Sequence, residues 1–217
     1  LPERFDCYQF NWQNTYGPVP RADGASYGRN KALAVTAVTN RINALLTTGT
    51  QVILVGYSGG AHVASEALTR MAWQGRTSKH LPAAVMVSNP LRGRNDGALA
   101  TTRYGIAGEH GTFPLGMKLF DLANPVDVIC QCPPPPHPLR SFTDLTEHFS
   151  LSDPLAWGTD LVTRANTGRW QNAWRLSSLP SWWDAVALAR GYAFDGQHTN
   201  WDVPRLPELG RRLAVSL

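Results

Sequence analysis

The sequence lacks any long apolar run, and it carries little charge. No window reaches the roughly 18 uninterrupted apolar residues of a membrane-spanning helix, so we expect no transmembrane segment. No basic-then-apolar leader stands at the N-terminus, which predicts that this chain carries no secretory signal peptide. Charged residues make up 17% of the chain, and the net charge of +4 is spread along it. This excess is too weak to predict a nucleic-acid partner.

Cysteine is also scarce. The three cysteines, Cys7, Cys130 and Cys132, cannot all pair within one chain. One residue separates Cys130 from Cys132, a spacing that suits neither a zinc knuckle nor an ordinary disulfide. We expect free thiols, with a bridge from Cys7 to one of the other two as the alternative. No metal-binding constellation and no phosphate-binding glycine loop stands out, so no metal or cofactor is expected.

The most informative pattern begins with residues 51–55, a short apolar run rich in β-branched side chains that is typical of a buried strand. The pentapeptide Gly56-Tyr57-Ser58-Gly59-Gly60 follows at once, and residues 61–73 then have helical spacing. Strand, G-x-S-x-G turn and helix form the context of a nucleophile elbow, in which the serine stands at the positive end of the helix. We therefore predict that Ser58 is a catalytic nucleophile. The first and last glycines of the pentapeptide are expected to let neighbouring backbone pass without a Cβ in the way.

The remaining patterns alternate between strand and helix. We predict strands at 6–12, 83–88 and 117–123 as well as 51–55, and a helix at 28–46. Strands that alternate with helices or long crossovers predict a mostly parallel sheet in an α/β fold.

The second half of the chain has a different character. A run of four prolines occupies 133–136 and must be extended. Helical patterns follow with no strand between them, at 141–149, 154–165 and 182–192. We interpret 139–192 as a helical insertion over the sheet, and 1–138 with 193–217 as the main α/β domain, ending in a helix at 206–217.

A serine nucleophile requires a base and an acid that orients it. In α/β-hydrolases these follow the serine in the order acid, then histidine. Asp127 lies just past the third strand, where ligands bind in open α/β sheets. His198 lies in a polar loop after the insertion, and His137 is the alternative base. Four prolines would carry His137 away from the sheet at about 3 Å per residue, so we favour His198. We predict that one ring nitrogen of His198 lies within hydrogen-bond reach of Ser58 and the other faces Asp127.

The order of three motifs resembles the cutinase-like serine esterases, and among them the mycobacteriophage lysin B enzymes. These motifs are Gly-Tyr-Ser-x-Gly-Ala at 56–61, Ser-Asn-Pro at 88–90 and Asn-Pro-x-Asp-x-Ile at 124–129. The resemblance runs over most of the chain. It implies an α/β-hydrolase fold with a parallel sheet flanked by helices, and a helical insertion between the catalytic Asp and His. In the short fungal cutinases the histidine follows the acid closely, as His137 would here.

The resemblance also implies an activity and its site. Lysin B proteins hydrolyse the ester that links mycolic acids to arabinogalactan, and so detach the outer mycobacterial membrane during phage lysis. One oxyanion donor would be the backbone N–H of Gly59. The second comes in that family from a His-Gly-Thr-Gly-like loop after the first strand. Nothing similar precedes Cys7, so we expect this chain to begin after that element and we assign no second donor.

The resemblance leaves several expectations about partners. The substrate would be a lipid or glycolipid ester of the mycobacterial envelope, with Tyr57, Trp182 and Trp183 as candidate substrate-binding residues. We expect a monomer, encoded by a phage, made in the host bacterium and acting at its envelope. Two alternatives stay open: a general cutinase or lipase-like carboxylesterase, and an inactive α/β-hydrolase fold that binds the envelope.

Overall fold

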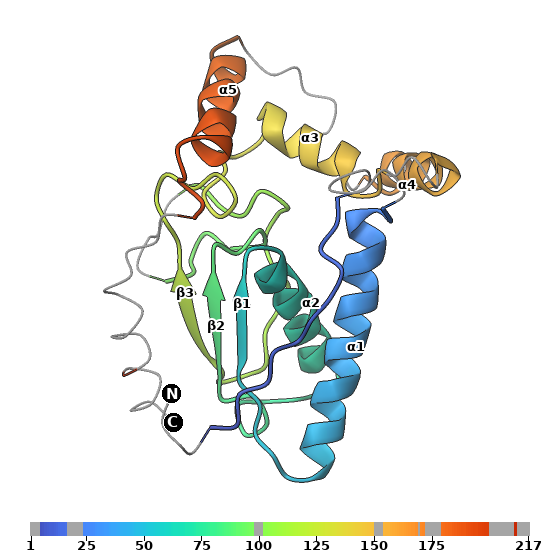
Figure 1. Cartoon of the computed structure of the whole chain (residues 1–217), viewed down its shortest axis with the longest axis vertical. Coiled ribbons are helices and arrows are strands. Elements are labelled where there is room, and N and C mark those ends of the chain that lie inside the picture. The colour runs from blue at the N-terminus through green and yellow to red at the C-terminus, as the bar shows by residue number, and fades with distance from the viewer. Residues whose placement is uncertain are drawn as a thin grey trace.

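The computed structural model of the chain describes residues 5–16, 24–97, 102–149, 154–168, 170–171, 179–199 and 211. A three-stranded parallel sheet of order β1-β2-β3 lies at the centre, and α1 and α2 pack side by side against it (Figure 1). Three further helices, α3, α4 and α5, lie beyond the end toward which the strands point. The protein is therefore mixed α/β, and its parallel sheet is flanked by helices.

The strands are β1 Leu54–Tyr57, β2 Ala83–Val87 and β3 Lys118–Leu122. The predictions for the second and third strands are confirmed to within one residue at each end. The first strand lies later than the predicted 51–55. Gly56 and Tyr57 continue the ladder opposite Met86 and Val87, whereas the N–H of Val52 donates to the carbonyl of His80 outside the ladder.

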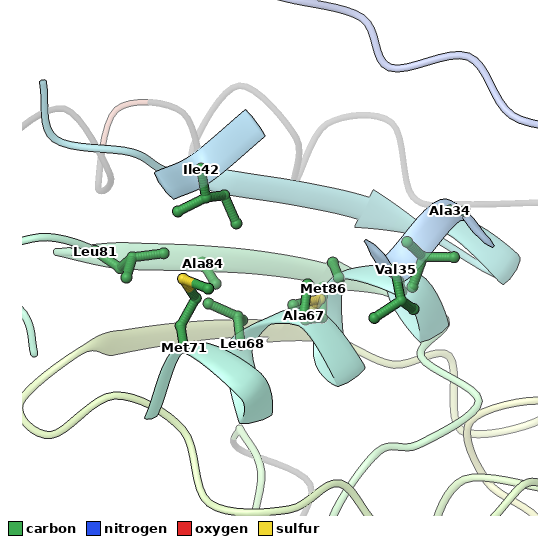
Figure 2. Close-up of a cluster of buried hydrophobic side chains, with 12 residues drawn as sticks. Ala34, Val35, Ile42, Ala67, Leu68, Met71, Leu81, Ala84 and Met86 are labelled. Carbon is green, nitrogen blue, oxygen red and sulfur yellow. The ribbon is translucent and has the colours of Figure 1, made fainter. Parts of the chain in front are cut away.

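Two long helices cover one face of the sheet. They are α1 Tyr27–Thr47, which confirms the predicted helix at 28–46, and α2 Gly59–Trp73. The N-cap of α1 is Ser26, whose hydroxyl accepts from the N–H of Arg29. Fully buried apolar side chains of both helices and of β2 form the main core (Figure 2). Those of largest size are Val35, Ile42, Leu68, Met71 and Met86, and Leu81, just before β2, joins them. A smaller cluster around Ala83 and Val85 lies on the opposite face of β2, as strand alternation requires.

The later helices are α3 Pro138–Thr146, α4 Pro154–Thr167 and α5 Leu179–Ala193. Over the described residues they follow one another without a strand, as predicted. Helix α3 starts three residues earlier than expected because Pro138 occupies its first turn, where proline needs no hydrogen-bond partner, and His137 is its N-cap. None of the described helices combines the length and the apolar character needed to span a bilayer.

The predicted strand at 6–12 is wrong. Residues 5–15 form no regular element. Phe10 and Trp12 pack against the main core, so the alternating pattern reflects side-chain burial without strand pairing. The predicted helix at 206–217 lies outside the described residues except for Arg211. All three cysteines are free thiols, Cys7 exposed and the other two buried.

A buried arginine joins α3 to the loops beneath it. Arg140 is fully buried, and its guanidinium lies 3.7 Å from the centre of the Tyr104 ring. It donates hydrogen bonds to the backbone carbonyls of Tyr104, Gly105, Cys132 and Pro133, and to the side chain of Gln171. A buried guanidinium is tolerated here because its donors find acceptors.

A second polar contact, the charged junction, consists of Lys31 on α1, Glu66 on α2, Glu147 after α3 and Arg164 on α4. The Lys31 ammonium lies 2.6 Å from both Glu66 and Glu147, and Glu147 also pairs with Arg164. The N–H of Gly28, in the first turn of α1, donates to the carbonyl of Glu147 at 2.7 Å. Polar contacts therefore fasten α3 and α4 to the two core helices.

Candidate active site

Ser58 sits at a sharp turn between β1 and α2. Its φ of 53° and ψ of −120° lie outside the regions that side chains usually adopt, and such strain is common at functional sites. A Cβ on Gly56 would lie 2.6 Å from the Cα of Ala61, so only glycine fits there. A Cβ on Gly60 would meet nothing within 4 Å. The expectation that Gly60 is also required for close backbone passage is therefore wrong.

The structure brings together the three predicted side chains. His198 Nε2 lies 2.9 Å from Ser58 Oγ, and His198 Nδ1 lies 2.9 Å from Asp127 Oδ2. The two contacts join residues 140 and 71 positions apart in the sequence. The predicted placement of His198 is confirmed. His137 instead lies 3.4 Å from Asp184 on α5, where it helps to join α3 to α5.

Asp127 has no exposed surface, and hydrogen bonds satisfy both of its carboxylate oxygens. Oδ1 accepts from the N–H of Ile129 at 3.0 Å. Oδ2 accepts from Ser88 Oγ at 2.5 Å in addition to His198, and Cys130 Sγ approaches it at 3.5 Å. Burial and the neighbouring Asp127 charge raise the pKa of the Cys130 thiol, so Cys130 stays protonated and can donate. These donors supply the hydrogen bonds that a buried carboxylate would otherwise take from water.

Two tyrosines enclose the His198 ring. Tyr57 stacks on it with ring centres 5.2 Å apart, and its hydroxyl donates to the carbonyl of His198 at 3.0 Å. Tyr192, near the end of α5, lies 5.1 Å from the imidazole on a tilted plane. The amide of Asn124 donates to the carbonyl of Gln197 at 2.8 Å. Tyr57, predicted as a substrate-binding residue, thus contacts His198 directly.

The N–H of Gly59 belongs to the first turn of α2, where the helix dipole favours negative charge. A Cβ placed on Gly59 would lie 3.0 Å from Asn14 Oδ1 and 3.3 Å from a ring carbon of Trp12. The N-terminal segment therefore lies against the glycine that the sequence predicts as an oxyanion donor. Sequence reasoning missed Asn14 and Trp12 because no motif surrounds them.

The other candidates lie apart from these contacts. Trp182 and Trp183 on α5 are 56% and 76% exposed, so they are available for contact with a substrate or a surface. Arg92, in the loop after β2, is fully buried and pairs with Asp121 at 2.6 Å. The Asp121 carboxylate, on β3, is therefore held by an arginine and not by a histidine of the candidate site. Within the described residues, no three His, Cys, Asp or Glu side chains are grouped as metal ligands.

Searches for relatives did not identify a family. No protein-family model matches the chain, and no curated protein matches its sequence. The geometry of the site and the sequence motifs are therefore the features that bear on function.

Proposed function

We propose that this protein is a serine esterase with an α/β-hydrolase fold. The observation that carries the proposal is the hydrogen-bonded series Ser58–His198–Asp127, with Ser58 at a strained strand-to-helix turn. The order serine, acid, histidine along the chain and the G-x-S-x-G context both support it.

Each side chain has a chemical role in this proposal. His198 Nε2 accepts the Ser58 proton as the Ser58 oxygen attacks the ester carbonyl. The N–H of Gly59 stabilises the oxyanion of the tetrahedral intermediate. The imidazolium then gives its proton to the leaving alcohol, which departs and leaves an acyl group on Ser58. A water molecule, deprotonated by His198, attacks the acyl-serine; the imidazolium returns this proton to the Ser58 oxygen as the acyl–oxygen bond breaks and the carboxylic acid is released. Asp127 stabilises the imidazolium in both halves of the reaction.

The proposed substrate is the ester between mycolic acids and arabinogalactan, with action at the mycobacterial envelope during phage lysis. The resemblance to the lysin B enzymes supports this substrate. The exposed apolar side chains of α4 and α5 are compatible with a lipid ester. They include Leu155, Val162, Leu179, Trp182, Trp183 and Val186.

Two assays test the proposal in order. Wild-type protein should hydrolyse a p-nitrophenyl ester and lose this activity after treatment with an organophosphate, whereas Ser58→Ala should retain at most about 10⁻⁴ of the rate. Absence of hydrolysis and of labelling would favour the inactive, envelope-binding alternative. Release of free mycolic acid from mycobacterial cell wall would then distinguish lysin B-type activity from a general cutinase or lipase.

A further inference from the structure

Two serines occupy equivalent positions at the ends of neighbouring strands. Ser58 follows β1 and Ser88 follows β2, and the N–H of each donates to the last residue of the next strand, at Val87 and Leu122 respectively. Among the described non-glycine residues, only these two have positive φ, 53° and 50°. The strained backbone at Ser58 is explained by the sharp turn from β1 into α2, which forms the proposed nucleophile elbow. The strain at Ser88 calls for a separate explanation.

The Ser88 side chain is fully buried and points at the proposed acid. Its Oγ lies 2.5 Å from Asp127 Oδ2. An ionised carboxylate has no hydrogen to give, so the Ser88 hydroxyl must be the donor. Hydrogen bonds to a charged acceptor are short and stronger than neutral ones, which agrees with this distance.

The oxygen that accepts from Ser88 is the same one that accepts from His198 Nδ1. The Cys130 thiol lies 3.5 Å from this oxygen, and burial, together with the Asp127 charge, raises the pKa of the Tyr192 phenol. Of these three contacts to Asp127 Oδ2, that of Ser88 is the shortest, at 2.5 Å against 2.9 Å for His198 and 3.5 Å for Cys130.

The next residue ties the same turn to the nucleophile helix. Asn89 Nδ2 donates to Ser65 Oγ at 2.9 Å, and Asn89 Oδ1 accepts from the N–H of Leu91 at 3.0 Å. Ser65 lies on α2, the helix that begins directly after Ser58. One short turn after β2 therefore contacts the acid through Ser88 and the helix of the nucleophile through Asn89.

We propose that Ser88 is a positioning residue of the triad, an inference that rests on the proposed esterase function. Its hydroxyl holds Asp127 Oδ2 in the orientation that receives His198, and it withdraws negative charge from that oxygen. The positive φ at Ser88 turns the hydroxyl from the end of β2 toward the acid. The Ser-Asn-Pro motif at 88–90 would then hold the acid through Ser88 and contact α2 through Asn89.

The test compares Ser88→Ala with Ser88→Gly. Both substitutions remove the hydroxyl, but glycine adopts positive φ without strain, so a purely structural role would leave Ser88→Gly near wild type. We expect both variants to lose about 10- to 100-fold in kcat with little change in KM. The acid limb of the kcat/KM profile should also move, because the carboxylate that faces His198 has lost a hydrogen-bond donor.

Ser26→Ala is the matched control, because it removes another buried serine hydroxyl, at the N-cap of α1. It should lower stability and leave the pH profile unchanged. Wild-type kcat and an unshifted profile in a folded Ser88→Gly protein would overturn the proposal.

A spectroscopic measurement separates this inference from the proposed function. The proton on His198 Nδ1, bound to a carboxylate, should give a far-downfield proton resonance that is absent in His198→Gln. It should move or broaden in both Ser88 variants. If the wild-type protein neither hydrolyses esters nor reacts with an organophosphate, the esterase proposal fails. In that case this resonance alone decides whether Ser88 positions the pair, and an unchanged resonance in Ser88→Gly refutes it.

Discussion

The proposed nucleophile and the proposed base are positioned by different parts of the molecule. Ser58 is placed by backbone geometry, at a turn between a strand and a helix that are fixed by the apolar core (Figure 2). His198 follows α5 and is held by hydrogen bonds and ring contacts. Tyr57 stacks on its ring and donates to its backbone carbonyl, and Asn124 donates to the carbonyl of Gln197. Apolar packing is almost insensitive to pH, whereas the polar contacts of the helical segment depend on charge. The base side of the site should therefore fail first when conditions change.

The largest effect is expected at Asp127, the carboxylate that contacts His198. Asp127→Asn should lower kcat by roughly 10⁴ while substrate binding persists, because an amide favours the wrong imidazole tautomer. Steady-state kinetics on a p-nitrophenyl ester measure this. Near-normal turnover would point to a different acid; Asp195, which is exposed, would be the next to test.

Removing the buried arginine should separate the helical segment from the core. Arg140→Ala leaves several carbonyls without their donor, and we expect a loss of about 3 to 5 kcal/mol in the free energy of unfolding. Hydrogen exchange should increase first in α3 and α5. Arg190→Ala, an exposed arginine of the same segment, is the control and should change stability by less than about 0.5 kcal/mol.

Leu68→Ala tests the apolar core in the way that Arg140→Ala tests the helical segment. We expect a loss of about 2 to 5 kcal/mol from the cavity alone, with kcat unchanged under conditions in which the protein stays folded. The contrast is informative only if Arg140→Ala lowers kcat of the folded protein and Leu68→Ala does not. Equal effects on kcat would mean that the base depends on the core as closely as the nucleophile does.

Acid should weaken the charged junction before the core. Burial alone would raise the pKa of Glu147, but Lys31 and Arg164 outweigh it and lower this pKa to about 2. A carboxyl whose pKa is lower in the folded state contributes stability above its unfolded value of about 4.5, and this is lost as pH falls toward 2. We expect a loss on the order of 2 kcal/mol over that range, partly offset by Asp144, whose pKa burial raises.

Urea unfolding at pH 7, 4.5 and 3 measures this dependence. The variant Glu147→Gln should have lower stability at pH 7 and a flatter dependence on pH than wild type. If wild type and Glu147→Gln lose stability in parallel below pH 4.5, other carboxyls govern acid unfolding.

The smallest effect concerns Tyr57. Tyr57→Phe removes the hydrogen bond to the carbonyl of His198 and keeps the stacked ring, so kcat should fall by about 3- to 10-fold with KM nearly constant. Tyr57→Ala should lose more, because the ring contact is also removed. A rise in KM at constant kcat would instead support the original prediction that Tyr57 binds substrate.

Much of the site could be predicted because its signals are local. A strand, the pentapeptide and a helix lie within one continuous stretch, and Asp127 follows a recognisable strand end. The choice of His198 over His137 used the stiffness of the proline run and the order known for a family. Both kinds of reasoning need only chain order and local conformation.

The supporting contacts could not be predicted in the same way. Lys31 and Glu147 are 116 residues apart, and Ser88 and Asp127 are 39 apart. Neither periodicity nor a motif indicates which distant polar side chains will meet. The predicted strand at 6–12 failed for a related reason, since alternation records which side chains are buried and not whether the backbone pairs.

The empty space beside Gly60 has a consequence for how such proteins are recognised. Gly56 cannot be exchanged without moving Ala61, whereas a methyl group at residue 60 would meet nothing within 4 Å. The G-x-S-x-G motif includes a final glycine, but the geometry of this turn leaves room for a larger residue at that position. Searches that require glycine at the fifth position would pass over sequences with alanine there, even though those chains could bend in the same way.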